Sequence, residues 1–104
     1  MRRGEVVNQI AQKIKEIAPR VSTILFGSEA RGDARQNSDI DLLILIPDEM
    51  ANNYHQIKSE IAGELYMIEL ENEVLISPLI LLQRMWDKRV TPFTCNVARE
   101  GILL

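Results

Sequence analysis

The sequence is poor in several features that would point to particular classes of protein. Its 104 residues include a single cysteine, Cys95, so no disulfide can form within the chain. No apolar run approaches the roughly 20 residues that a membrane-spanning helix needs. Residues 1–5 contain an acidic side chain and no apolar stretch follows them, so we expect no signal peptide. These absences favour a protein of the reducing cytoplasm, without a membrane partner.

The chain also lacks the excess of positive charge that is typical of nucleic-acid-binding proteins. Its net charge is −3, so we expect no bulk binding of nucleic acid. Any nucleotide would have to meet a local patch, for which Arg31 and Arg35 are the candidates. The hydrophobic share of 46% and the charged share of 26% are ordinary for a globular protein, and the length suits one domain over residues 1–104.

Two common phosphate and metal motifs are missing. There is no Gly-Lys-Ser or Gly-Lys-Thr, which excludes a P-loop. An EF-hand that began at the acidic pair Asp39 and Asp41 would place Leu43 at a ligand position and Ile44 at the required glycine. Any metal or nucleotide site must therefore be of another kind.

Hydrophobic periodicity predicts a small α/β (α+β) domain, with a mixed β-sheet and helices packed on it. The predicted helices cover residues 3–18, 53–69 or a little beyond, 82–88 and 93–100, and the predicted strands cover 21–26, 38–46 and 74–81. The second strand is apolar on both faces in its second half, which indicates a central position. Pro78 cannot donate a hydrogen bond to a neighbouring strand, so its end of the third strand is predicted to be an edge or a bulge. Residues 71–73 form a polar break, and 33–37 a polar loop.

The chemistry is concentrated between the first two strands. Asp39 and Asp41 stand at the start of a buried strand, where side chains alternate between the two faces. Both carboxylates therefore project from one face, about 7 Å apart at their backbones, and could converge on divalent ions. Ile40 and Leu42 point into the core on the other face. Two like charges in such a place are costly unless a cation lies between them.

The turn that leaves the first strand suits a phosphate. Gly27 permits a sharp turn and the close approach of a ligand, and the hydroxyl of Ser28 and nearby amides could hold phosphate oxygens. Arg31 and Arg35 could neutralise further negative charge. Each part is a weak signal alone, and the acids could simply end a strand. The joint pattern of strand, Gly-Ser, ten residues and Asp-x-Asp predicts a metal-dependent nucleotide site.

These residues resemble the signature of the DNA polymerase β-like nucleotidyltransferase superfamily. The string FGSEARG at 26–32, with SDIDL at 38–42, is similar to its minimal nucleotidyltransferase (MNT) branch, and residues 96–102 are similar to a frequent ending of short MNT chains. The resemblance implies a polymerase β-like core, ATP as the donor and two Mg²⁺ ions. Asp39 and Asp41 would be catalytic metal ligands, and Gly27, Ser28 and Arg31 would bind the nucleotide.

The same resemblance implies a third carboxylate on a later strand, and the predicted third strand contains no Asp. Glu73, at the start of that strand, is the best match by position for this catalytic and metal-binding role. Glu71 and Glu69 are alternatives, and all three could instead be the solvated end of a helix.

The function implied by the resemblance is transfer of a nucleoside monophosphate, AMP in the first instance, to a hydroxyl group. The chain is too short for a second, acceptor-binding domain, so the acceptor is expected on a partner protein or a second copy. MNT proteins are frequently antitoxins that adenylylate a HEPN-type toxin. The alternative is a catalytically weak binding module that neutralises its partner by contact, which the missing third Asp favours. A homodimer that modifies its own surface hydroxyl is a third hypothesis.

Overall fold

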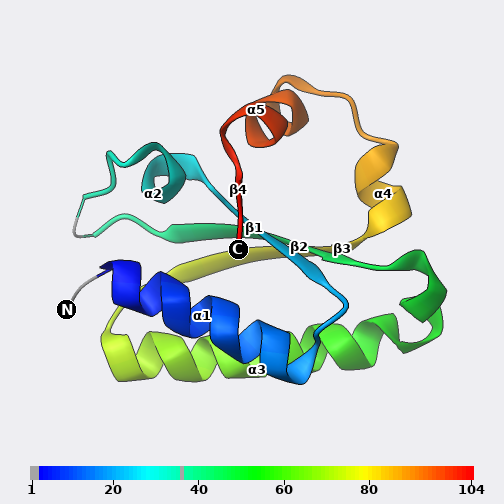
Figure 1. Ribbon diagram of the computed structural model, residues 1–104, viewed down its shortest axis with the longest axis horizontal. Coiled ribbons are helices and arrows are strands. Elements are labelled where there is room, and N and C mark those ends of the chain that lie inside the picture. Colours follow the sequence, from blue (N-terminus) through cyan, green and yellow to red (C-terminus); the bar gives the residue numbers. More distant parts are fainter. Residues whose placement is uncertain (1–2, 36) are drawn as a thin grey trace.

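The computed structural model describes residues 3–35 and 37–104 (Figure 1). Met1 and Arg2, in the segment considered for a signal peptide, and Gln36, in the predicted loop 33–37, lie outside the described residues. The elements in chain order are α1 (Arg3–Ile17), β1 (Ser22–Phe26), α2 (Gly27–Arg31), β2 (Ile40–Ile46), the 3₁₀ helix η1 (Asp48–Asn53), α3 (Tyr54–Asn72), β3 (Ile76–Leu82), α4 (Gln83–Asp87), α5 (Pro92–Glu100) and β4 (Ile102–Leu103).

The sheet is mixed, with the strand order β3-β2-β1-β4. β1 is antiparallel to β2 and to β4, whereas β2 and β3 are parallel. The predicted central position of the second strand is confirmed, and of the two alternatives for the third strand, an edge or a bulge, the structure shows an edge. Pro78 is tolerated in β3 because that strand has only one neighbour in the sheet.

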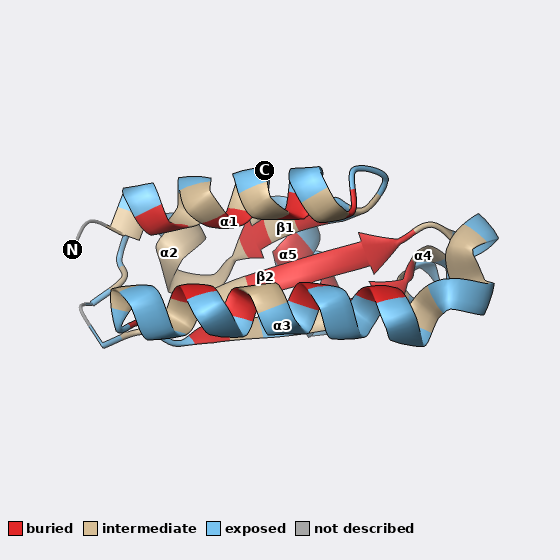
Figure 2. Cartoon of the chain, turned by 90° about the horizontal axis from the view of Figure 1, so that it is seen from below, coloured by how far each residue is buried: buried red, intermediate tan, exposed pale blue. Residues whose placement is uncertain are grey.

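One face of the sheet is covered by α1 and α3, which run side by side beneath it (Figures 1 and 2). Each helix has one buried side (Figure 2), formed by apolar residues three or four positions apart: Val6, Ile10 and Ile14 in α1, and Ile57, Ile61, Leu65 and Ile68 in α3. They meet Ile40, Leu42, Ile44 and Ile46 of β2, all of which have no exposed surface. This layer forms the main core.

The opposite face carries α2, α4 and α5 (Figure 1). A smaller cluster of Leu43, Leu45, Leu81 and Val97 lies here, with Trp86 packed against it. Because side chains alternate along β2, Asp41 belongs to the same face as Leu43 and Leu45. The acidic pair therefore stands on the face that the short helices cover.

The structure departs from the predicted elements in several places. The predicted polar break at 71–73 is wrong, because α3 continues to Asn72 and only Glu73 caps it. Ile102–Leu103 form a short strand, β4, that pairs with β1, where no strand was predicted. The turn predicted after the first strand is the beginning of a short helix, α2, which starts at Gly27 itself. Within the described residues, no helix is long and apolar enough to cross a membrane.

Candidate functional site

The acidic pair lies at the start of the central strand. Asp39 precedes β2 and is exposed, and Asp41 is its second residue and half-buried. Asp41 is paired with Phe26 of β1 on one side and with Ser77 of β3 on the other. These three side chains form a row across the sheet on one face, because residues in register point the same way.

Gly27 brings the Gly-Ser turn directly onto the acidic pair. A Cβ atom at this position would lie 2.4 Å from Oδ2 of Asp41, so no residue with a side chain fits without displacing the carboxylate. The backbone there has φ +75°, which favours glycine for a second reason. The two halves of the motif, ten residues apart in sequence, are thus in contact in space.

The electrostatics of the pair favour a cation. Partial burial, and next the charge of Asp39, raise the pKa of Asp41, while the positive charge of Arg31 opposes this shift. The carboxylate of Asp41 is thus destabilised as an anion. A divalent ion between the two acids would remove this cost, and carboxylate oxygens are ligands that Mg²⁺ accepts.

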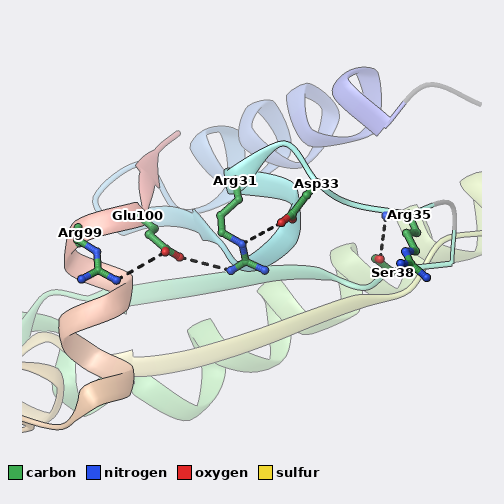
Figure 3. A network of polar contacts seen from close by, with 6 residues as sticks. All are labelled: Arg31, Asp33, Arg35, Ser38, Arg99 and Glu100. Carbon is green, nitrogen blue, oxygen red and sulfur yellow. Dashed lines mark hydrogen bonds and ion pairs between the residues drawn. The ribbon is translucent and has the colours of Figure 1, made fainter.

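Arg31 lies at the far end of α2, within a network of charges (Figure 3). Its Nε donates to Asp33 Oδ2 at 3.3 Å, and its Nη1 donates to Glu100 Oε2 of α5 at 3.4 Å. Both acids raise the pKa of Arg31, so the guanidinium is charged at any physiological pH. Arg31 also borders a hollow of about 260 Å³ between α2 and α5, lined by Phe26, Gly27, Phe93, Asn96, Val97 and Glu100. Gly27, which contacts Asp41, is thus also part of the wall of this hollow.

The loop that joins the two halves of the motif is held by hydrogen bonds. Ser38 Oγ accepts from the backbone N–H of Arg35 at 3.0 Å (Figure 3), and its carbonyl accepts from Arg3 Nη2 at 2.7 Å. Arg3 also pairs with Glu29 of α2. Ser28 lies in the first turn of α2, where its carbonyl accepts from Asp33 N–H at 3.1 Å.

Glu73 stands apart from this arrangement. It caps α3 in a left-handed conformation (φ 53°) and is exposed. Across residues 3–35 and 37–104, no three His, Cys, Asp or Glu side chains form a group that could hold a metal ion, so Glu73 does not make a triad with Asp39 and Asp41. The physical reason is that α3 continues past the predicted break. The row of Asp41 is reached only at Ser77, four residues further along the chain.

The alternative acids have structural partners. Glu69 Oε2 accepts a hydrogen bond from the backbone N–H of Ile76 at 2.9 Å, which ties the end of α3 to the start of β3. Glu71 Oε2 accepts from Gln9 Nε2 of α1 at 3.3 Å. Both contacts join elements of the fold.

Ser77 was not predicted as part of the site. Its Oγ donates to Asp39 Oδ2 at 2.8 Å, and its backbone is in register with Asp41. The signal available in the sequence was a lone hydroxyl residue in the otherwise apolar run 74–82, followed by proline. Its contact with Asp39 depends on the parallel pairing of β2 and β3, which the local sequence does not specify.

Comparison with known proteins agrees with this geometry. The family model described as a nucleotidyltransferase domain matches residues 7–94, which include the acidic pair, the Gly-Ser turn and Ser77. The chain belongs to the nucleotidyltransferase domain family. The resemblance noted for its motif is therefore confirmed, and so is the fold class.

A named relative of this nucleotidyltransferase domain comes from Methanocaldococcus jannaschii. It is called "Putative protein adenylyltransferase", and it is 37% identical over 81 residues, which cover 69% of this chain and 79% of the relative.

Solved structures share the fold of the nucleotidyltransferase domain. A putative nucleotidyltransferase covers 94% of this chain and 96% of its own, with a TM-score of 0.60 and 21% identity. A putative nucleotidyltransferase from Sulfolobus solfataricus covers 95% of this chain and 76% of its own, with a TM-score of 0.53 and 20% identity. A toxin–antitoxin structure with AMP-PNP covers 92% of this chain and 69% of its own, with a TM-score of 0.54 and 19% identity.

Proposed function

We propose that this chain is a Mg²⁺-dependent nucleotidyltransferase that transfers AMP from ATP to a hydroxyl group of a partner protein. The observation that carries the proposal is the contact between Gly27 and the carboxylate of Asp41. It joins a turn suited to phosphates to a pair of acids suited to a divalent ion, within a chain of the nucleotidyltransferase family.

The residues present fit a divalent cation. Asp39 and Asp41 offer hard oxygen ligands on one face. Burial, and next the charge of Asp39, raise the pKa of Asp41, and a bound cation would offset both effects. Mg²⁺ held by these acids would supply positive charge to the phosphate oxygens and the departing pyrophosphate. We leave Glu73 outside the proposed ligand set, because it forms no three-ligand group with them, and its role stays a prediction from sequence position.

The other residues would bind and orient the nucleotide. The bare Cα of Gly27 lets phosphate oxygens approach the acids, and Ser28 offers its hydroxyl in the same turn. Arg31, kept charged by Asp33 and Glu100, borders the hollow beside Gly27 and would bind the outer phosphates. In the reaction the acceptor oxygen bonds to the α-phosphorus, the bond from that phosphorus to pyrophosphate breaks, and the hydroxyl proton passes to water.

The acceptor proposed is a protein. The relative from Methanocaldococcus jannaschii bears the name of a protein adenylyltransferase, and one structural neighbour is a toxin–antitoxin structure with AMP-PNP. We therefore propose a small helical toxin of the HEPN type as partner, with this chain as its antitoxin. A second copy of the chain is the alternative acceptor. The free and exposed thiol of Cys95 suits a cytoplasmic setting, where thiols stay reduced.

A second candidate function is neutralisation of the partner by contact alone. The observation that favours it is the presence of only two carboxylates at the site, within the part of the chain that the structure describes. Asp39→Asn and Asp41→Asn variants separate the two functions: a binder would still neutralise its partner fully, whereas an enzyme would lose neutralisation together with transfer.

Calorimetric titration with AMP-PNP tests the site itself. The native chain should bind AMP-PNP in the presence of Mg²⁺, and Asp41→Asn should weaken that binding at least about tenfold, the cost of one charged contact. Asp87→Asn, in α4, is the matched control and should bind as the native chain does. Equal affinity of the native chain and Asp41→Asn would refute the proposed site.

A further inference from the structure

Ser77 touches the acidic pair from the neighbouring strand. Its hydroxyl donates to Asp39 Oδ2 at 2.8 Å, and its backbone is opposite Asp41 in the parallel pairing of β2 with β3. It is therefore next to both acids, although it lies 36 positions after Asp41 in the sequence. The residues assigned so far to the nucleotide and metal do not include it.

The backbone that carries Ser77 is firmly held. The N–H of Ile76 donates to Glu69 at 2.9 Å, and the carbonyl of Leu75 accepts from the N–H of Ile40 at 2.9 Å. Pro78, with its fixed φ, follows directly and pairs with Leu42. A hydroxyl on such a backbone can hold the exposed Asp39 carboxylate in one orientation. Less side-chain conformational entropy is then lost when Asp39 binds an ion.

Ser77 is also uncharged. An acid at this position would place a third carboxylate beside Asp39 and Asp41, whereas serine adds a donor and no negative charge. The affinity of a site for a divalent ion rises with the number of its anionic ligands. With only two anions, the native site depends more strongly on how those two are oriented.

We infer that Ser77 is a positioning residue of the cation site: its hydroxyl orients Asp39 for a divalent ion, in the place where a third carboxylate would bind that ion more tightly. The inference rests on the proposed function, because it concerns the metal site of the same reaction. Serine at this position supplies a neutral donor and no third anion, so the identity of residue 77 tunes the strength of metal binding.

Titration with Mn²⁺, without nucleotide or acceptor, tests the inference by calorimetry. Ser77→Ala should weaken Mn²⁺ binding about tenfold, the scale known for residues that orient a metal ligand, and Ser77→Thr should restore it. Ser59→Ala, on the exposed face of α3, is the matched control and should change nothing. Native affinity in a folded Ser77→Ala protein would overturn the inference.

Replacement of Ser77 by an acid should strengthen Mn²⁺ binding. Ser77→Asp should bind Mn²⁺ roughly tenfold more tightly than the native chain, because it adds an anionic ligand. Its melting temperature should fall in EDTA, through repulsion among three acids, and recover when Mn²⁺ is added. A folded Ser77→Asp protein that binds Mn²⁺ no better than the native chain would contradict the inference.

Two more variants separate this inference from the proposed function. If Asp39→Asn binds Mn²⁺ as the native chain does, the proposed metal site fails and the inference with it. If Asp39→Asn weakens binding while Ser77→Ala does not, only the inference fails. Glu73→Gln should leave Mn²⁺ affinity unchanged. A loss of affinity as large as that of Asp39→Asn would show that Glu73 is a third acidic ligand, which would overturn the inference.

Discussion

Asp41 carries an energetic conflict at the scale of a single residue. The fold needs an apolar residue on each side of it in β2, and Ile40 and Leu42 are fully buried. The carboxylate between them is partly desolvated and faces the charge of Asp39, and both effects raise its pKa. A side chain that is unfavourable for folding and useful for binding a cation is typical of a functional site.

The conflict predicts that Asp41→Asn stabilises the chain when divalent ions are absent. Since the pKa of Asp41 is raised in the native state, the native chain holds this proton at pH values where the unfolded chain has lost it. The contribution of Asp41 to stability therefore decreases as the pH rises from the unfolded value of 3.8 through the raised native value. The advantage of Asp41→Asn should grow over that range and then stay constant up to neutral pH.

Urea unfolding in EDTA, at a series of pH values from about 3 upwards, measures this difference. Asp87→Asn serves as the control for loss of one negative charge, since that residue is exposed in α4. A native chain that is as stable as Asp41→Asn at neutral pH would show that Asp41 is not strained by its surroundings.

Arg31 gives a second prediction at this scale. Its charge lies near Asp41 and borders the hollow beside Gly27, so Arg31→Ala should raise the KM for ATP roughly tenfold, the cost of a lost charge-assisted contact. Arg99 belongs to the same network through Glu100, at 3.8 Å (Figure 3), but does not line the hollow. Arg99→Ala should therefore leave KM unchanged, and steady-state kinetics on both variants would decide. An equal rise in KM for both variants would mean that the effect comes from the net charge of the protein and not from a contact of Arg31 with ATP.

At the scale of elements, the turn from β1 into α2 determines whether the site can form. Gly27→Ala should disturb the site, because its Cβ would overlap Asp41 and its backbone has φ +75°. The strain of a left-handed residue alone is about 1–2 kcal/mol. Thermal melting should show a loss of stability, and AMP-PNP titration a loss of binding.

Gly63 provides the control for this substitution. It lies inside α3, and a Cβ added there would meet no atom within 4 Å, so Gly63→Ala should stabilise the chain by about 0.8–1 kcal/mol. Its melting temperature should rise by about 4–8 °C per kcal/mol, with nucleotide binding unchanged. If Gly27→Ala behaved like Gly63→Ala, the close contact with Asp41 would be of no consequence.

How far the sequence predicts each element depends on the range of the interactions that form it. The buried strands and the amphipathic helices follow from local periodicity, and the acid pair follows from its place at the start of β2. β4 has only two residues, both exposed, so no local pattern distinguishes it from a tail. Its pairing with Ile24 and Leu25 is a long-range event.

Long-range pairing also explains why Ser77, and not Glu73, lies beside the acidic pair. Sequence position favours Glu73, which is close to the predicted third strand, but α3 extends to Asn72 and β3 begins only at Ile76. The parallel register of β2 and β3 then places Ser77 opposite Asp41. Register between strands joined by a long helix cannot be read from either strand alone.

At the scale of the whole molecule, two layers of helices enclose most of the sheet. The main core packs beneath it against α1 and α3, and the smaller cluster lies above it (Figures 1 and 2). The row of Phe26, Asp41 and Ser77 lies on the upper face, beside the hollow between α2 and α5. The described residues of this face form the proposed nucleotide site, and the acceptor is proposed to come from another chain.

The proposal as a whole requires that this site transfers AMP and that Asp39 and Asp41 are needed for it. The most direct measurement is label transfer from ATP to the partner protein in Mg²⁺, with the label placed in parallel on the α- or the γ-phosphate. We expect transfer of the α-label only, reduced roughly 10²–10³-fold by Asp41→Asn, as for other lost transition-state contacts. Transfer of the γ-label, or α-label transfer that survives Asp41→Asn unchanged, would contradict it.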